Sequence, residues 1–180
     1  MRSGLKGFAW AGPVLFLAVS LLVAGRIVAL RPPGGIGHDT GIATGLLAVI
    51  AKRPAFSIGF RNVLSDVVWL EAVQVMGNTK MTPAEFDRLF ELLNVASDFD
   101  PKFEIPYLLG GLVLGESVPH ARNALHVLGR GRAQYPADWR FPFYMGFTHY
   151  FCLGDAVAGG EAMAEAARLP GSPAYVPGLA

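Results

Sequence analysis

The sequence is poor in cysteine and in charge. Its 180 residues include one cysteine, Cys152, which excludes an internal disulfide and lies too far from the amino terminus to carry a lipid. Charged residues make up 16% of the chain, the formal net charge is +1, and no stripe of Lys and Arg is present, which argues against a nucleic-acid partner. We therefore expect packing of apolar side chains to provide the stability.

Motifs of catalytic or cofactor-binding specificity are also missing. The glycines of residues 34–37 follow no strand and lack the lysine of a phosphate-binding loop, so they indicate a linker. His149 and Cys152 have the spacing of half a metal site, but no second His or Cys pair completes it, and no haem-attachment motif is present. Asp98 and Asp100 lack the glycine and the glutamate spacing of a calcium loop. We predict no enzyme activity, no catalytic residue, no cofactor and no metal ligand.

What the chain does have is a long uncharged run near its start, residues 7–25, between Lys6 and Arg26. As a helix this run reaches roughly 28 Å, against roughly 30 Å for a bilayer core. We predict that residues 1–30 form one transmembrane anchor that contacts lipid through residues 8–30, with an inside amino terminus and the body on the non-cytoplasmic side. The alternative is a signal peptide that is cleaved after export, with Leu22, Val23 and Ala24 as its small-residue exit.

After the anchor, residues 31–39 form a Pro/Gly spacer and residues 40–180 an all-α body. Residues 40–51 are predicted to be a short helix that lies either against the membrane or against the next element. Further helices are predicted at residues 60–76, 83–98, 103–116, 120–134, 139–153 and 158–169, with a seventh starting near residue 174. The first of these carries one apolar stripe of Phe60, Val63, Leu64, Val67, Val68 and Val75. Thr82 and Glu85 form a capping box at the start of the second.

The body contains an internal repeat. Residues 103–110 match residues 139–146 in kind at nearly every position, an offset of 36, and a partial third copy begins at residue 174. Each copy reads as a helical hairpin in which Gly110 or Gly146 lets the partner helix approach, against Ala124 or the pair Ala162 and Ala166. Because the third copy breaks off, we expect either that the sequence is a fragment of a longer array or that a partner covers the helix at 158–169.

These features resemble the tetratricopeptide-repeat (TPR) family. Two units match over about residues 103–170, with Leu109 and Gly110, Met145 and Gly146, and Ala124, Leu128 and Pro136 at the family's positions; residues 60–98 resemble a divergent third unit. The sequence departs from the family at Pro106, Pro142 and Gly131. Residues 59–70 also look like a stretch of bacterial membrane-anchored proteins of this kind. The resemblance implies an α-solenoid.

In the resembled superhelix, the first helices of the units line a concave face that binds a protein or peptide partner. On this chain the pattern places Glu104, Tyr107, Leu114, Arg140, Phe143, Phe147 and Tyr150 on that face. Such a face suits an apolar or amphipathic peptide. The alternative is that half of these aromatic residues are ordinary core between the helices. We therefore expect a membrane-tethered adaptor or an accessory subunit of a membrane complex. The alternatives are an assembly chaperone that holds an exported client and, as a third class, a metal- or haem-linked redox protein.

Overall fold

The computed structural model describes Val49 and residues 59–180, all within one unit that spans Gly41–Ala180. The predicted anchor at residues 1–30, the spacer at 31–39 and the short helix at 40–51 lie outside the described residues, apart from the helical and exposed Val49. Among the residues that are described, no helix is both long and apolar enough to cross a membrane.

The described part of the chain is all-α, with no strand. Its α-helices are α3 (Arg61–Met76), α4 (Pro83–Phe99), α5 (Glu104–Gly115), α6 (Ala121–Gln134), α7 (Arg140–Phe147) and α8 (Ala156–Arg168). Short helical turns are η2 (Val118–His120), the π-helical η3 (Thr148–Cys152) and η4 (Val176–Leu179). The helices predicted between residues 60 and 169 are confirmed to within two residues at their ends. The one predicted at 139–153 is formed by α7 together with η3.

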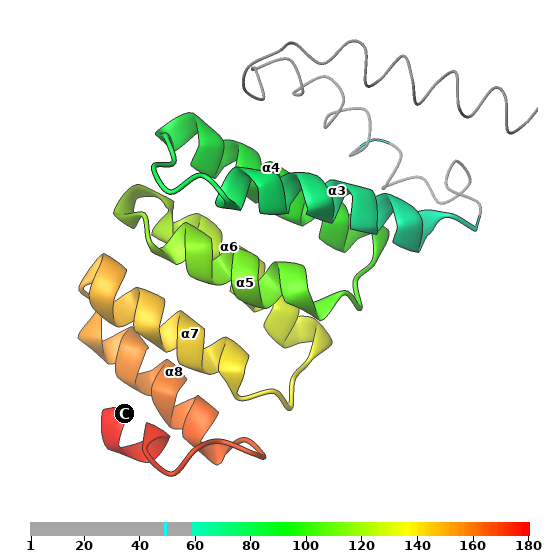
Figure 1. The fold of residues 1–180 in the computed structure, drawn as a ribbon. Coiled ribbons are helices and arrows are strands. Elements are labelled where there is room, and N and C mark those ends of the chain that lie inside the picture. The colour runs from blue at the N-terminus through cyan, green and yellow to red at the C-terminus, as the bar shows by residue number, and fades with distance from the viewer. Residues whose placement is uncertain (1–48, 50–58) are drawn as a thin grey trace, which may run out of the picture. The chain divides into compact units, whose positions relative to one another are not determined.

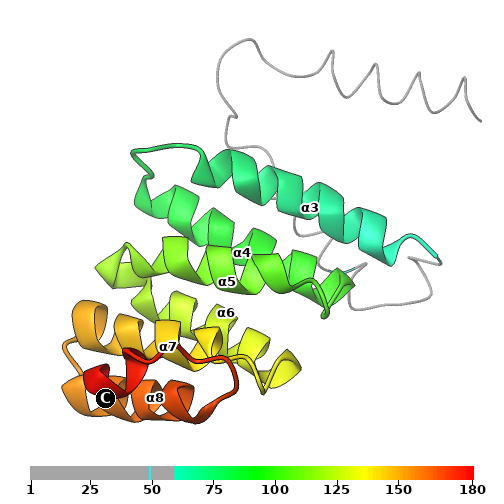
Figure 2. The same cartoon turned by 60° about the horizontal axis from the view of Figure 1, so that its bottom comes forward.

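The helices pair as three hairpins that follow one another in chain order (Figures 1 and 2). Helix α3 packs against α4, α5 against α6, and α7 against α8, while α4 also packs against α5 and α6 against α7. Below, α3, α5 and α7 are called the first helices, and α4, α6 and α8 the second helices. Consecutive hairpins therefore join through a second helix and the next first helix.

Local sequence accounts for several helix ends. Thr82 and Glu85 form the predicted capping box, in which the Glu85 N–H donates to the Thr82 hydroxyl at 3.3 Å and the Thr82 N–H to a Glu85 carboxylate oxygen at 2.7 Å. Asp155 caps α8 by accepting the Ala158 N–H at 3.0 Å. The turn before it uses Gly154 in the left-handed region, φ +66°, where glycine has no steric penalty. These contacts satisfy backbone donors that the first turn of a helix leaves free.

The core runs through all three hairpins. Its largest fully buried side chains are Tyr107, Phe99, Phe141, Leu89, Leu92, Leu93, Leu114, Leu128, Val68, Val127 and Val176. On α3 the predicted single stripe is wrong, because Val68 and Val75 are buried whereas Phe60, Val63 and Val67 are exposed. Helix α3 has apolar residues on more than one side, and only one side can face α4.

Glycines allow close helix contacts within and between the hairpins. A Cβ at Gly146 would lie 2.9 Å from the Gly159 carbonyl oxygen and 2.8 Å from Met163 Cγ, both of α8. This glycine therefore admits its partner helix as predicted, but its nearest neighbours are Gly159 and Met163 instead of Ala162 and Ala166. A Cβ at Gly110 would instead meet Leu93 of the preceding α4 at 2.4 Å, and Gly111 is the residue that faces Leu128 of α6. The expectation for Gly110 is therefore corrected, since it admits a helix of the preceding hairpin.

The partial third copy of the repeat does not start an α-helix. It forms η4, which packs on α8 and buries Val176 completely. The Tyr175 ring also contacts the Phe143 ring, with centroids 6.5 Å apart. Residues of the third copy thus cover part of the last hairpin.

Candidate functional site

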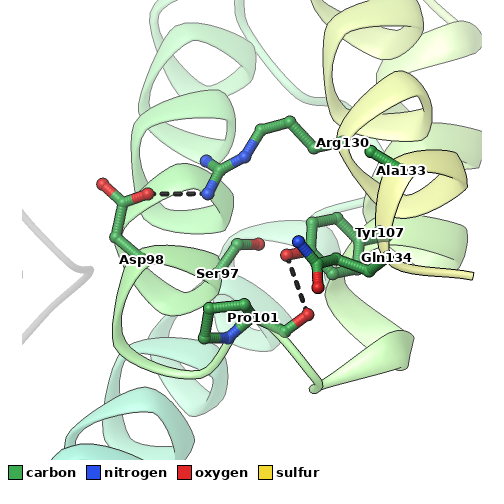
Figure 3. Close-up of a pocket in the computed structure, with 7 residues that line it drawn as sticks. All are labelled: Ser97, Asp98, Pro101, Tyr107, Arg130, Ala133 and Gln134. Atoms are coloured by element: carbon green, nitrogen blue, oxygen red, sulfur yellow. Dashed lines mark hydrogen bonds and ion pairs between the residues drawn. The ribbon is translucent and has the colours of Figure 1, made fainter.

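A cavity of about 430 Å³ opens where the end of α4, the start of α5 and the end of α6 meet (Figure 3). It is lined by Ser97, Asp98, Pro101, Tyr107, Arg130, Ala133 and Gln134. Figure 3 shows Arg130 reaching from α6 toward Asp98 on α4, and the Tyr107 hydroxyl pointing at the Pro101 carbonyl. The cavity therefore lies at the junction between the first and second hairpins.

The polar groups of this cavity bond mainly to one another. Arg130 donates to an Asp98 carboxylate oxygen at 2.6 Å and to the Asn94 amide oxygen at 2.7 Å. The Tyr107 hydroxyl donates to the Pro101 carbonyl oxygen at 3.2 Å, and burial raises the pKa of this tyrosine, which keeps the donor protonated. Asn94 and Arg130 stand one repeat apart, so the cluster acts as a joint between hairpins.

A second cavity, of about 670 Å³, lies at the start of α7 and includes Trp139 and Arg140. The Arg140 guanidinium donates to both carboxylate oxygens of Asp138, at 3.0 Å from Nε and 2.5 Å from Nη2, and it also bonds Glu104. These hydrogen bonds from Arg140 lower the pKa of Asp138. Glu104 and Arg140 were both expected on the partner face, but they neutralise each other across one repeat.

The other predicted face residues divide into buried and exposed ones. Tyr107 is 1% exposed and Leu114 is fully buried, so the expectation that they face a partner is corrected: both belong to the core. Phe143 is half-buried among the rings of Trp139, Tyr144 and Tyr175. Phe147 and Tyr150 are exposed. Two of the seven candidates are thus large apolar side chains open to solvent.

Sequence reasoning missed several exposed apolar residues on the first helices. They are Leu70 and Val73 on α3, Ile105 and Leu109 on α5, and Phe151 in η3, in addition to Phe60, Val63 and Val67 of the predicted stripe. The sequence of α3 does contain a signal of this exposure, because apolar residues lie on all sides of the helix. A helix with such a distribution is normally covered on more than one side.

One group of side chains has the composition of a nucleophilic triad: Ser117, His120 and Asp87. The Ser117 hydroxyl lies 2.8 Å from His120 Nδ1, and His120 Nε2 lies 3.3 Å from an Asp87 carboxylate oxygen. In a triad the serine faces Nε2, and a buried carboxylate holds Nδ1; here the two nitrogens are used the other way and Asp87 is exposed. The His120 ring stacks on Phe86 at 5.0 Å, so the constellation ties the α5–α6 turn to α4.

His149 and Cys152, the candidate half of a metal site, lie in η3. The Cys152 thiol donates to the Gly115 carbonyl oxygen at 3.0 Å, a contact between η3 and the end of α5. Within the described residues, no group of three or more His, Cys, Asp or Glu side chains is placed to hold a metal ion.

Comparison with known proteins found no protein-family model, no curated protein and no solved structure that matches the chain. Function is therefore inferred from the sequence and from the geometry of the described residues.

Proposed function

We propose that this protein is a membrane-tethered adaptor, or an accessory subunit of a membrane complex, whose TPR-like α-solenoid binds a protein partner through its first helices. The supporting observation is the distribution of exposed apolar side chains. Helices α4 and α6 expose no large apolar residue, whereas α3 exposes Val63, Val67 and Leu70, and α5 exposes Ile105 and Leu109. The α7–η3 segment adds exposed rings at its end.

The spacing on α3 shows that these residues share one side. Phe60, Val63, Val67 and Leu70 follow one another at intervals of three and four, which is the pattern of a helix–helix contact. Single exposed apolar residues are common, but apolar residues that gather on one side mark an interaction surface. Burying such a side releases about 25 cal/mol per Å² of apolar surface, so a partner has a physical reason to bind there.

An assembly chaperone would use the same surface, and the number of partners separates the two functions. An adaptor holds one partner in fixed stoichiometry, whereas a chaperone holds many unfolded clients. The membrane tether, predicted from residues 1–30, applies to both.

Site-specific photo-crosslinking of the full chain in its native membranes tests the proposal. A photoreactive p-benzoylphenylalanine replaces Leu109 on α5 or Val67 on α3, and as matched controls replaces the exposed Glu91 on α4 or Arg122 on α6. We expect one discrete adduct from the first helices and none from the second helices. A broad smear of adducts would favour the chaperone, and equal labelling from both sets, or none at all, would overturn the proposal.

A further inference from the structure

A cluster of exposed aromatic residues lies at the end of the third hairpin's first helix. We call Phe147, Tyr150, Phe151, Leu153 and Val157 the aromatic patch; all five side chains are exposed, Phe151 by 63%. The Phe151 ring lies 4.4 Å from the Phe147 ring and 4.9 Å from the Tyr150 ring, centroid to centroid. The three rings therefore support one another while they remain open to solvent.

The repeat itself provides the control for this patch. At the offset of 36, Phe147 corresponds to Gly111 and Phe151 to Gly115 in the second hairpin. Gly111 is buried, and a Cβ there would lie 2.6 Å from Leu128, so the second hairpin needs a glycine where the third has an exposed ring. A hairpin of this kind therefore folds without these phenylalanines, and packing does not explain their presence.

The backbone presents the patch through the π-helical turn η3, Thr148–Cys152. Two side-chain hydrogen bonds help to hold the turn: the Thr148 hydroxyl donates to the Tyr144 carbonyl oxygen at 2.9 Å, and the Cys152 thiol donates to the Gly115 carbonyl oxygen at 3.0 Å. Such turns are rare within helices and occur frequently at functional sites. Here the turn carries Tyr150 and Phe151, so it sets the direction of both rings.

The acidic and basic residues that neighbour the patch in sequence have one sign. Residues 141–167 contain no Lys or Arg, while the exposed Asp155 and Glu161 lie within this range and the exposed Glu116 follows Gly115 directly. The Asp155 N–H donates to the His149 carbonyl oxygen at 2.9 Å, which fixes Asp155 against η3. A ligand with positive charges beside its apolar groups therefore complements this surface, and an acidic ligand does not.

We propose that the aromatic patch binds a basic, apolar segment of a partner protein. Apolar side chains of that segment lie on the rings of Phe147 and Phe151, and its Lys or Arg side chains lie over a ring face or beside Asp155 and Glu161. The inference rests on the proposed adaptor function and adds the chemistry of the partner.

Three synthetic peptides of equal length serve as probes: one of Leu and Lys, one of Leu and Glu, and one of Ser and Lys. The full chain is placed in nanodiscs of zwitterionic lipid, with p-benzoylphenylalanine in place of Phe151, or in place of Glu91 on α4 as the control for peptide that only partitions into the lipid. We expect the Leu/Lys peptide to label position 151 at least about tenfold more than the other two peptides, which corresponds to a difference in binding free energy of about 1.4 kcal/mol. We expect weak labelling of position 91 by all three.

A double variant, Phe147→Ser with Phe151→Ser, checks that the rings carry the binding. We expect it to weaken binding of the Leu/Lys peptide by about tenfold or more in fluorescence anisotropy, while the control pair Ala84→Ser with Glu91→Ser on α4, outside the proposed binding surfaces, leaves it unchanged. Both pairs are exposed, and thermal unfolding followed by circular dichroism confirms that each variant folds.

Several results would overturn the inference. Equal labelling by the Leu/Glu peptide would show that charge does not select the ligand. An adduct formed only with a second copy of the chain would make the patch a dimer contact. An adduct formed only with lipid would make it a membrane contact. If the peptides fail while the crosslink from Leu109 in native membranes still yields one discrete adduct, the adaptor function stands and only the partner chemistry falls.

Discussion

The first and second helices of the hairpins differ in what they leave exposed. Helices α4 and α6 are amphipathic: each buries one apolar side and exposes polar or small residues such as Glu91, Arg122 and His126. Helix α3 has apolar residues around its circumference, and α5 exposes Ile105 and Leu109 although its core side is already filled. Both kinds of helix belong to the same stack.

This difference separates what folding requires from what it does not. The pattern of α4 and α6 follows from burial against their own hairpin and the next one, and neither helix leaves a large apolar residue exposed; α8 differs, because it exposes Val157. The first helices have more apolar surface than the stack covers. We propose that this excess apolar surface binds the partner, and matched substitutions on the two kinds of helix can test this division.

The largest contrast is expected between two leucines. Leu128→Ala on α6 empties a fully buried position and should lower the free energy of unfolding by about 2–5 kcal/mol. Leu109→Ala on α5 removes a side chain that is 44% exposed and should cost no more than about 1 kcal/mol. Urea denaturation of the full chain in detergent measures both; equal losses would mean that Leu109 is as much a core residue as Leu128.

Two glycines on α6 should respond in opposite directions. A Cβ at Gly131 would lie 2.2 Å from the Phe141 ring and 2.7 Å from Tyr107 Cβ, so Gly131→Ala should destabilise the protein by about 1–3 kcal/mol. Gly129 has no neighbour within 4 Å of such a Cβ, so Gly129→Ala should stabilise it by about 0.5–1 kcal/mol through a better helix propensity. Thermal melts read both shifts, and the same sign for both would contradict the packing at Gly131.

Much of the fold could be predicted because local signals agreed with it. The capping box at Thr82 depends on residues close in sequence, and the offset of 36 between hairpins depends on repetition of the sequence. The repeat also relates two pairs of residues that bond each other across neighbouring hairpins. Asn94 with Arg130 and Glu104 with Arg140 are each separated by 36 residues.

The exposed side of the first helices was harder to predict because α5 is apolar on several sides. Periodicity shows which residues share a side, and it does not show which side meets the core when all are apolar. Tyr107 and Leu114 were therefore assigned to the surface, whereas the structure buries both and exposes Leu109, which was placed only before the family's glycine. The direction of the rings in η3 depends on a π-helical turn, and no local residue pattern predicts that change in backbone hydrogen bonding.

A smaller effect is expected from acid at the joint between the second and third hairpins. Arg140 lowers the pKa of Asp138, so the charged carboxylate stabilises the fold above its ordinary pKa, and this contribution is lost as the pH falls through the lowered value. Asp138→Asn should cost about 1 kcal/mol or less at neutral pH, because the pair is partly exposed. The cost should vanish in strong acid. A cost that is independent of pH in denaturation curves would assign the role of Asp138 to hydrogen bonding alone.

The smallest effect on stability, and the most informative about function, is expected at Val67 on α3. This side chain is 55% exposed, and glutamine is a better helix former than valine, so Val67→Gln should change the free energy of unfolding by less than about 0.5 kcal/mol. If the outward side of α3 binds a partner, the same change should remove the adduct formed by a photoreactive residue in place of the neighbouring Leu70. Glu91→Gln on α4 is the matched control and should leave that adduct unchanged. A variant that keeps both its stability and its adduct would show that the apolar excess of α3 has no role in binding, and the division between the two kinds of helix would then be one of composition only.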